Sequence, residues 1–105
     1  MKKIYSLASP QHFDYVLNKG QKIRSKYFLI SFVPNKNFQI GISIPKKLGN
    51  AVFRNKQKRQ VKNIIDSLNI YQNHFHLVVI VKKPFTELDF LKKTKILKQE
   101  IDKII

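Results

Sequence analysis

One stretch of the chain, residues 45–67, combines helical periodicity with a high density of positive charge. It reads PKKLGNAVFRNKQKRQVKNIIDS and holds seven of the twenty-one Lys and Arg residues. At about 100° per residue, its apolar side chains gather on one arc and its basic and amide side chains on the neighbouring arc. The apolar arc consists of Phe53, Val61, Ile64, Ile65 and Leu68. The stretch therefore predicts a helix with one stripe in a core and a second stripe for a partner.

The basic arc of this helix points to a polyanion. It consists of Arg54, Asn55, Lys58, Arg59 and Lys62. Their i, i+4 spacing sets donors about 5.4 Å apart along the axis, which is comparable to the spacing of phosphates along a nucleic-acid strand. A merely solvated helix face normally mixes both signs of charge. Residues 15–65 hold twelve Lys or Arg and no Asp or Glu, so a nucleic-acid surface is the favoured interpretation.

Composition supports the same partner and limits the alternatives. The chain has 105 residues, enough for a single domain spanning 1–105, and a formal net charge of +15 with a pI near 10.2. An anionic membrane is the weaker option, because no apolar run approaches the ~20 residues of a spanning helix and the N-terminus lacks the apolar segment of a signal peptide. The chain has no cysteine, which agrees with a cytoplasmic location.

A short helix is expected near the N-terminus. Ser9 suits the N-cap, Pro10 the first helical position, and Gly20 a C-terminal residue in the left-handed conformation. Its core stripe is Phe13, Val16 and Leu17. His12 and Tyr15 lie off that stripe, so we expect them to be exposed.

Strand patterns follow. Residues 27–33 and 38–44 alternate apolar and polar side chains and are separated by the turn residues 34–37, which predicts a hairpin. Residues 23–24 could form a brief first strand. The continuously apolar run 75–81 predicts a strand buried on both faces. We expect Gly49, in the connection to the basic helix, to relieve a backbone or close-approach constraint.

The last element is predicted to be a helix that begins at Thr86, with Asp89 in the third position of a capping box. Its apolar face is expected to be Leu88, Leu91, Leu97, Ile101, Ile104 and Ile105. Its lysines are interpreted mainly as a solubilising surface: Lys92, Lys93, Lys95, Lys98 and Lys103.

The elements in order predict an α/β (α+β) two-layer sandwich, α-β-β-β-α-β-α. The passage from the strand containing Ile40 to the strand ending at Val81 is expected to be a parallel crossover. The general rule for such connections favours the right-handed form.

These residues resemble the bacterial ribonuclease P protein component. The motif R-N-x-x-K-R-x-x-R of that family is carried by Arg54, Asn55, Lys58 and Arg59, with Lys62 in place of the final Arg. Lysine keeps the charge but lacks the bidentate guanidinium fork. Four further family motifs occur in the same order, matched by Phe13, Val16 and Gly20; by Arg24 and Phe28; by Gly41 to Ile44; and by Val78 to Pro84.

The resemblance implies a protein subunit of ribonuclease P. Such proteins are small cytoplasmic α/β sandwiches with a left-handed β-α-β crossover. They bind a catalytic RNA subunit and the 5′ leader of precursor tRNA, and the complex removes the leader. The resemblance further implies one protein per RNA, Mg²⁺ ions held mainly by the RNA subunit, and catalytic chemistry that resides in the RNA.

Carried over residue by residue, the resemblance assigns two sets. The RNA-subunit set is Lys46, Lys47, Arg54, Asn55, Lys58, Arg59 and Lys62. The leader set is Phe13, Leu17, Arg24, Lys26, Tyr27 and Ser31. Phe13 would be the aromatic wall of a leader cleft, while Leu17 and Ser31 stand where stacking would be weaker.

No catalytic residue and no metal site are predicted in the protein itself, because its six carboxylates are scattered. His74 and His76 lie at strand spacing on one side, so a metal pair is conceivable, but two histidines without a third ligand are more often structural. Two alternatives stay open. A ribosomal or other structural RNA-binding protein would share the charge and the fold, and a DNA-binding module would share the charge.

Overall fold

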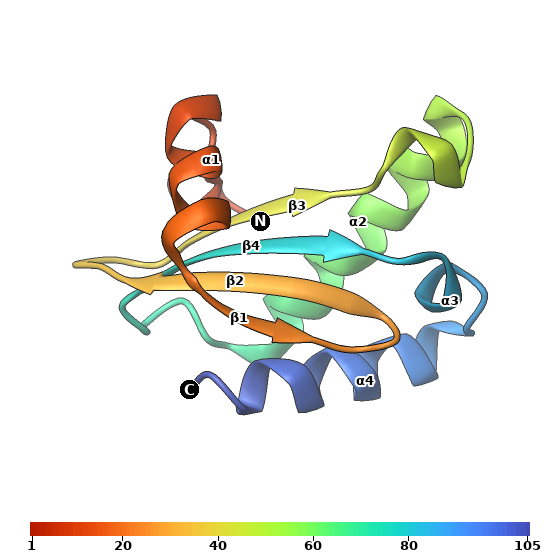
Figure 1. The fold of residues 1–105 in the computed structure, drawn as a ribbon. Coiled ribbons are helices and arrows are strands. Elements are labelled where there is room, and N and C mark those ends of the chain that lie inside the picture. The colour runs from red at the N-terminus through yellow and green to blue at the C-terminus, as the bar shows by residue number, and fades with distance from the viewer.

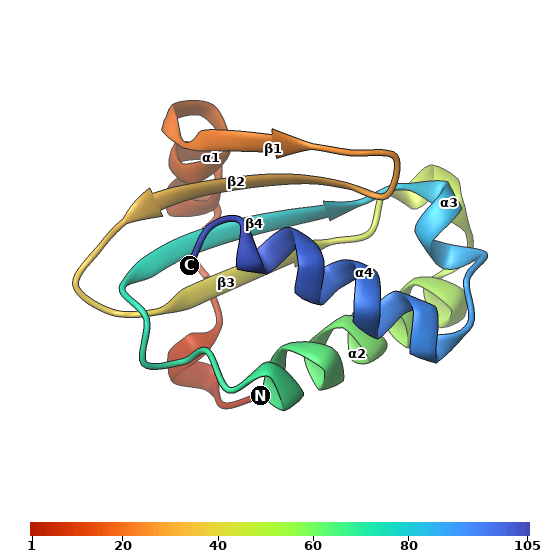
Figure 2. The same ribbon diagram turned by 90° about the horizontal axis from the view of Figure 1, so that it is seen from below.

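A four-stranded sheet separates one helix from two others in the computed structural model, which describes residues 1–105. Helix α1 lies on one face of the sheet, and α2 and α4 lie on the other (Figures 1 and 2). The elements are η1 (Lys3–Tyr5), α1 (Pro10–Lys19), β1 (Gln21–Arg24), β2 (Phe28–Pro34), β3 (Gln39–Ser43), η2 (Lys46–Leu48), α2 (Ala51–Leu68), β4 (Phe75–Val81), α3 (Lys83–Thr86) and α4 (Phe90–Asp102). The predicted order of the main elements is confirmed. No helix combines the length and the apolar character needed to span a membrane.

The strand order, β1-β2-β4-β3, shows that the predicted hairpin is wrong. Strand β4 lies between β2 and β3, antiparallel to the first and parallel to the second. The physical reason is the apolar run of β4. Because nearly all of its side chains are buried, on both faces, it takes a central place in the sheet. The turn residues 34–37 instead carry the chain across the width of two strand spacings, about 10 Å.

The connection from β3 through α2 to β4 is the expected parallel crossover. In Figure 1 both strands run to the right, α2 passes below the sheet, and β4 lies in front of β3, as the view from below in Figure 2 shows. Seen along the direction from β3 to β4, the chain turns anticlockwise as it passes from β3 through α2 to β4. The crossover is therefore left-handed. The family expectation is confirmed, and the general right-handed rule does not hold for this connection.

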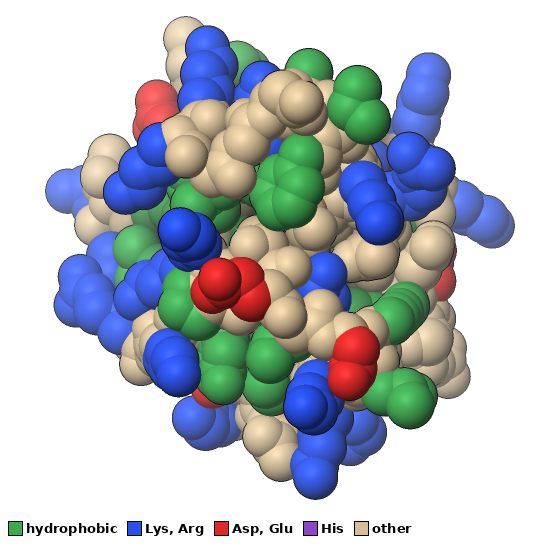
Figure 3. All heavy atoms as spheres, turned by 90° about the vertical axis from the view of Figure 1, so that its right-hand side faces the viewer, with side chains coloured by type: hydrophobic (Ala, Val, Ile, Leu, Met, Phe, Trp, Pro, Cys, Tyr) green, Lys and Arg blue, Asp and Glu red, His purple; other side chains and the backbone are tan.

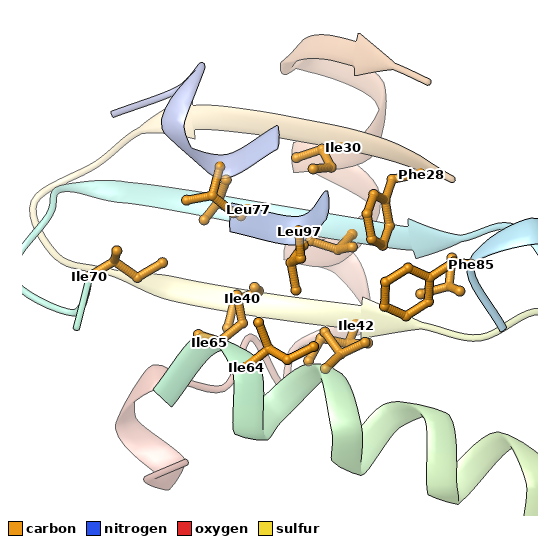
Figure 4. Close-up of a cluster of buried hydrophobic side chains, with 14 of the residues drawn as sticks. Phe28, Ile30, Ile40, Ile42, Ile64, Ile65, Ile70, Leu77, Phe85 and Leu97 are labelled. Carbon is orange, nitrogen blue, oxygen red and sulfur yellow. The ribbon is translucent and has the colours of Figure 1, made fainter. Parts of the chain in front are cut away.

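The main core lies between the sheet and the pair α2 and α4 (Figure 4). Ile64 and Ile65 of α2 point toward β3, and the Phe28 and Phe85 rings pack with centroids 4.6 Å apart. The apolar arc predicted for α2 is confirmed for Val61, Ile64, Ile65 and Leu68, whereas Phe53 lies outside this core and against Gly49. Gln57 is buried beside the arc. A much smaller cluster of Leu7, Val16 and Val78 lies under α1.

The ends of α1 follow the prediction at one side only. The Ser9 hydroxyl accepts a hydrogen bond from the His12 backbone N–H, as an N-cap should. Gly20 does close the helix, but its φ of −72° is not left-handed, so that expectation is wrong. What position 20 requires is space: a Cβ there would lie 2.5 Å from the Ser31 Oγ. The one left-handed residue is Asn69, at φ 53°, which ends α2.

The last helix begins later than predicted. The short helix α3 occupies residues 83–86, and α4 begins at Phe90, after Asp89 has accepted a hydrogen bond from the Lys92 N–H. Asp89 is therefore the N-cap itself, not the third residue of a box begun by Thr86. This shift leaves Leu91 85% exposed, although it was expected on the apolar face.

Lys93 is an exception to the interpretation of the α4 lysines as mainly a solubilising surface. Its side chain is 3% exposed. The ammonium donates to the Oε1 atoms of Gln57 and Gln60 on α2, at 2.9 and 2.6 Å, and lies 5.5 Å from the Phe85 ring centroid. Burial, and then the charge of Lys56, lowers the pKa of Lys93. The sequence pattern of α4 alone could not predict the burial of Lys93, because the two amide oxygens that accept from it belong to α2.

Candidate nucleic-acid interface

The basic row on α2 is presented by a well-defined helix start. The Asn50 Oδ1 accepts a hydrogen bond from the Phe53 N–H at 2.9 Å, and the Arg54 Nε–H donates to the Gly49 carbonyl at 3.2 Å. Gly49 lies directly under the Phe53 ring, because a Cβ at position 49 would be 2.5 Å from a ring carbon. The expected close approach at Gly49 is therefore confirmed.

The row lines a set of adjoining hollows. The largest, about 360 Å³, lies between α1, β3 and α2. It is lined by Phe13, Ile42, Ser43, Ile44, Arg54, Asn55 and Lys58. A second, about 320 Å³, is lined only by Asn55, Lys58, Arg59 and Lys62. Because the two share Asn55 and Lys58, we treat them as one surface, named here the basic hollow.

Phe13 reaches the basic hollow because β3 has no side chain where the two meet. A Cβ built on Gly41 would lie 2.8 Å from two carbons of the Phe13 ring. Glycine inside a strand often marks the close approach of another group, and here it lets the ring lie against the strand. The hollow thus combines an aromatic wall with a row of cations and an amide.

The cations of the hollow are free of acidic partners. The three ion pairs of the protein are the amino terminus with Asp66, Lys98 with Asp102, and Lys103 with Glu100. None involves Arg54, Lys58, Arg59 or Lys62. Figure 3, which views the right-hand side of Figure 1, shows Lys and Arg side chains projecting around the edge of this face, with acidic side chains near its centre. Cations arranged in this way attract a polyanion at long range.

The rest of the RNA-subunit set lies just before α2. Lys46 and Lys47 are exposed in η2. Lys47 also borders a separate hollow of about 300 Å³ with a largely apolar lining that includes Leu29 and Ile80. That hollow opens on the face of the sheet that carries α1, beyond the end of the helix. Its lining also includes Lys82 and Lys83.

The structure does not bring the predicted leader set together. Arg24 and Lys26 are exposed at the end of β1, which is the sheet edge opposite β3. Tyr27 packs against the main core, and Leu17 packs against the small cluster under α1. Of the six residues, only Phe13 lines the basic hollow.

Ser31 needs a correction, because it was expected to face a bound strand. It is completely buried beneath α1, and its hydroxyl donates to the Val16 carbonyl at 2.6 Å. Its role is to hold the helix on the sheet. Alternation along β2 separates Ser31 from the face of Phe28 and Ile30, but alternation cannot tell an open face from one that a helix covers.

The histidines are also arranged differently from the prediction. His74 is exposed and lies outside β4, so it does not pair with His76. His76 is buried and faces His12 of α1, with Nδ1 and Nε2 2.7 Å apart. His12 was expected to be exposed and is partly buried. Burial, and then the charge of His12, lowers the pKa of His76. Sequence reasoning missed this pair, because residues 12 and 76 meet only through the fold.

A single α+β domain with helices on both faces of its sheet, an aromatic wall and an unpaired row of cations defines a small RNA-binding domain. A family model described as Ribonuclease P matches residues 1–105. The ribonuclease P protein component of Mycoplasmopsis synoviae is 39% identical over 104 residues, covering 99% of this chain and 89% of that protein. The same protein of Streptococcus agalactiae is 36% identical, covering 86% and 84%.

Solved structures agree with this match. The RNase P protein of Staphylococcus aureus superposes with a TM-score of 0.85 at 28% identity, covering 93% of both chains. That of Thermotoga maritima gives 0.80 at 27% identity, covering 89% of this chain and 91% of the other. The chain belongs to the ribonuclease P protein family.

Proposed function

We propose that this protein binds the catalytic RNA of ribonuclease P through the row on α2 and the 5′ leader of precursor tRNA at Phe13. Family membership gives it a role in the 5′ processing of tRNA. The observation that carries the proposal is the basic hollow, in which Phe13 lies beside Arg54 and Lys58 without any carboxylate. One RNA strand can therefore meet both kinds of contact at once.

The contacts of the hollow divide into two physical roles. The cations neutralise backbone phosphates and release condensed counterions, which gives affinity that falls as salt rises. The Phe13 ring offers a face on which one base can stack, worth about 1 to 3 kcal/mol and tolerant of sequence. Asn55 adds an amide that can donate and accept. Such a surface binds and orients a flexible single strand without reading every base.

The protein contributes positioning to the reaction. No three side chains of His, Asp or Glu come together in a way that could hold a metal ion. In the proposal, Mg²⁺ is bound mainly by the RNA subunit, which also carries the catalytic groups. The protein lowers the repulsion between the two RNAs and holds the leader in place.

The remaining features of the proposal follow from this role. The surface that would meet the RNA subunit belongs to one segment of the chain, η2 and the row on α2, which fits one protein per RNA. A subunit that matures tRNA works in the cytoplasm.

Reconstitution tests the proposal directly. The RNA that copurifies with the protein from its own cell is identified, transcribed and combined with the purified chain at low magnesium. We expect the pair to remove the leader from precursor tRNA, the RNA alone to cleave poorly under these conditions, and the protein alone not to cleave at all. Cleavage by RNA-free protein would contradict the division of roles. Copurification of ribosomal RNA alone would favour a structural RNA-binding protein instead.

A further inference from the structure

Helix α1 is held on the sheet by few apolar contacts. The cluster beneath it has three buried residues, Leu7, Val16 and Val78, whereas the core on the other face has fifteen. Polar links therefore matter more for α1 than for α2 or α4. One of them is the hydrogen bond from the Ser31 hydroxyl to the Val16 carbonyl, near the C-terminal half of the helix.

The second polar link lies at the N-terminal end of α1, next to Phe13. The His12 Nε2 is 2.7 Å from the His76 Nδ1, and the two rings are nearly perpendicular, at 89°. The other ring nitrogen of His76, Nε2, is 2.6 Å from the Asn37 Oδ1. We name these three residues the histidine chain. It joins α1 to β4 and to the connection between β2 and β3.

The Asn37 Oδ1 determines which ring nitrogens of the histidine chain carry a hydrogen. The Asn37 Oδ1 can only accept, so the His76 Nε2 carries a hydrogen and donates it. In neutral His76 the Nδ1 atom is then an acceptor, and His12 must donate to it from Nε2. A proton added to the His12 Nδ1 leaves the hydrogen bond between the two rings intact. A proton added to the His76 Nδ1 breaks it, because that nitrogen is the acceptor.

We propose that the histidine chain positions α1, and through it Phe13, for the single strand that enters the basic hollow. It is a positioning set and touches no substrate. This inference rests on the proposed function, because it assigns the leader to Phe13. The groups around the chain support it. Tyr15 of α1 stacks on the His12 ring at 5.8 Å, and Val33 and Gln39 flank His76 in the neighbouring strands. Among charged groups, only His12 acts on His76.

The first test needs no RNA. Long-range ¹H–¹⁵N spectra of the histidine rings distinguish a protonated from an unprotonated ring nitrogen. In the folded protein near pH 7.5, about one unit above the ordinary pKa of histidine, we expect hydrogen on Nε2 of both His12 and His76, with His76 Nδ1 unprotonated. A hydrogen on His76 Nδ1 would contradict the proposed hydrogen bonds of the histidine chain. So would ring-nitrogen signals of His76 that match those of the exposed His74.

The second test measures the ratio of affinities of the reconstituted complex for leader-bearing and mature tRNA. His12→Ala should lower this ratio about two- to tenfold, the factor expected for one hydrogen bond. His76→Asn should keep the ratio close to wild type, because its Oδ1 can still accept from His12. His74→Ala serves as the control and should match the wild type.

A pH profile separates positioning from simple packing. Because the pKa of His76 is lowered, the wild-type ratio should hold down to about pH 6.5, the ordinary pKa of histidine, and should fall below it as His76 takes up a proton, while the ratio of His76→Asn should stay flat. If Phe13→Ala lowers the ratio but His12→Ala and pH do not, the positioning role is wrong and the proposed function stands. If the wild type does not distinguish the two RNAs at any pH, the proposed function itself fails.

Discussion

Phe13 owes its place in the basic hollow to the residue opposite it. Gly41 of β3 leaves its side-chain space to the ring, and any Cβ there would press on two ring carbons. The ring is partly buried, so one face packs on the protein and the rest remains for a base. Its contribution to binding and its contribution to packing can be separated by experiment.

Replacing Phe13 by Ala should weaken binding of leader-bearing precursor tRNA and leave binding of mature tRNA nearly unchanged. Loss of one stacked base predicts about 1 to 3 kcal/mol, measured as a ratio of dissociation constants in the reconstituted complex. Phe90→Ala is the matched control, because that ring is 41% exposed on α4 and lies outside the hollow. Equal losses for both RNAs would assign Phe13 to packing alone.

Lys93 was expected on the surface of the last helix and is buried in the structure. Lys93→Met keeps the length of the side chain but leaves the buried Gln57 oxygen without its donor. We expect the free energy of unfolding to fall by about 1 to 3 kcal/mol, measured by urea denaturation. Lys92→Met, at the exposed neighbouring position, should change it little.

At the scale of the element, α2 joins the core and the RNA surface in one rigid body. Its buried side chains, Val61, Ile64 and Ile65 among them, hold the helix on the sheet. The basic row is therefore presented with little freedom to adapt, and its contacts with phosphates should act independently of base sequence.

Arg59→Ala should weaken binding to the RNA subunit and reduce its dependence on salt. Each phosphate contact that is lost removes about 0.7 to 0.9 units of slope in log K against log salt. Lys95→Ala is the control, since Lys95 is exposed on α4, outside every hollow that the row lines. An unchanged slope for Arg59→Ala would place the RNA subunit on another surface.

The elements also show what sequence could and could not predict. Helix α2 was predicted with its stripes, because periodicity and charge are local properties of one segment. The pairing of β2 with β3 was wrong, because the choice of neighbour depends on β4, some forty residues further along the chain. In the candidate site, the family motifs identified the basic row on α2 and Phe13 on α1. Local patterns could not show that Ser31 is covered or that His12 meets His76.

At the scale of the whole molecule, Asp66 near the end of α2 links the amino terminus to the segment that follows the helix. Its carboxylate accepts from the Tyr71 hydroxyl and from the amino group of Met1. The hydrogen bond from Tyr71 is the main reason that the pKa of Asp66 is lowered. The unfolded chain therefore binds a proton at Asp66 before the folded chain does. This contribution to stability is present above about pH 4 and is lost as the pH falls through the lowered pKa.

Asp66→Asn should therefore be less stable than the wild type at neutral pH, and the difference should shrink as the pH falls below about 4. Urea unfolding midpoints at neutral and acid pH measure this change. Asp14→Asn provides the control, because Asp14 is exposed and belongs to none of the three ion pairs. A difference that stays constant with pH would remove Asp66 as the titrating group.

The central position of β4 also has a consequence for how the chain is made. The strand that joins β2 to β3 is the last of the four to be synthesised. Until residues 75–81 have left the ribosome, β3 has no neighbour in the sheet, and the apolar stripe of α2 has only part of its core to pack on. The basic helix, in the stretch that holds seven of the twenty-one Lys and Arg residues, therefore leaves the ribosome before the sheet on which it packs is complete.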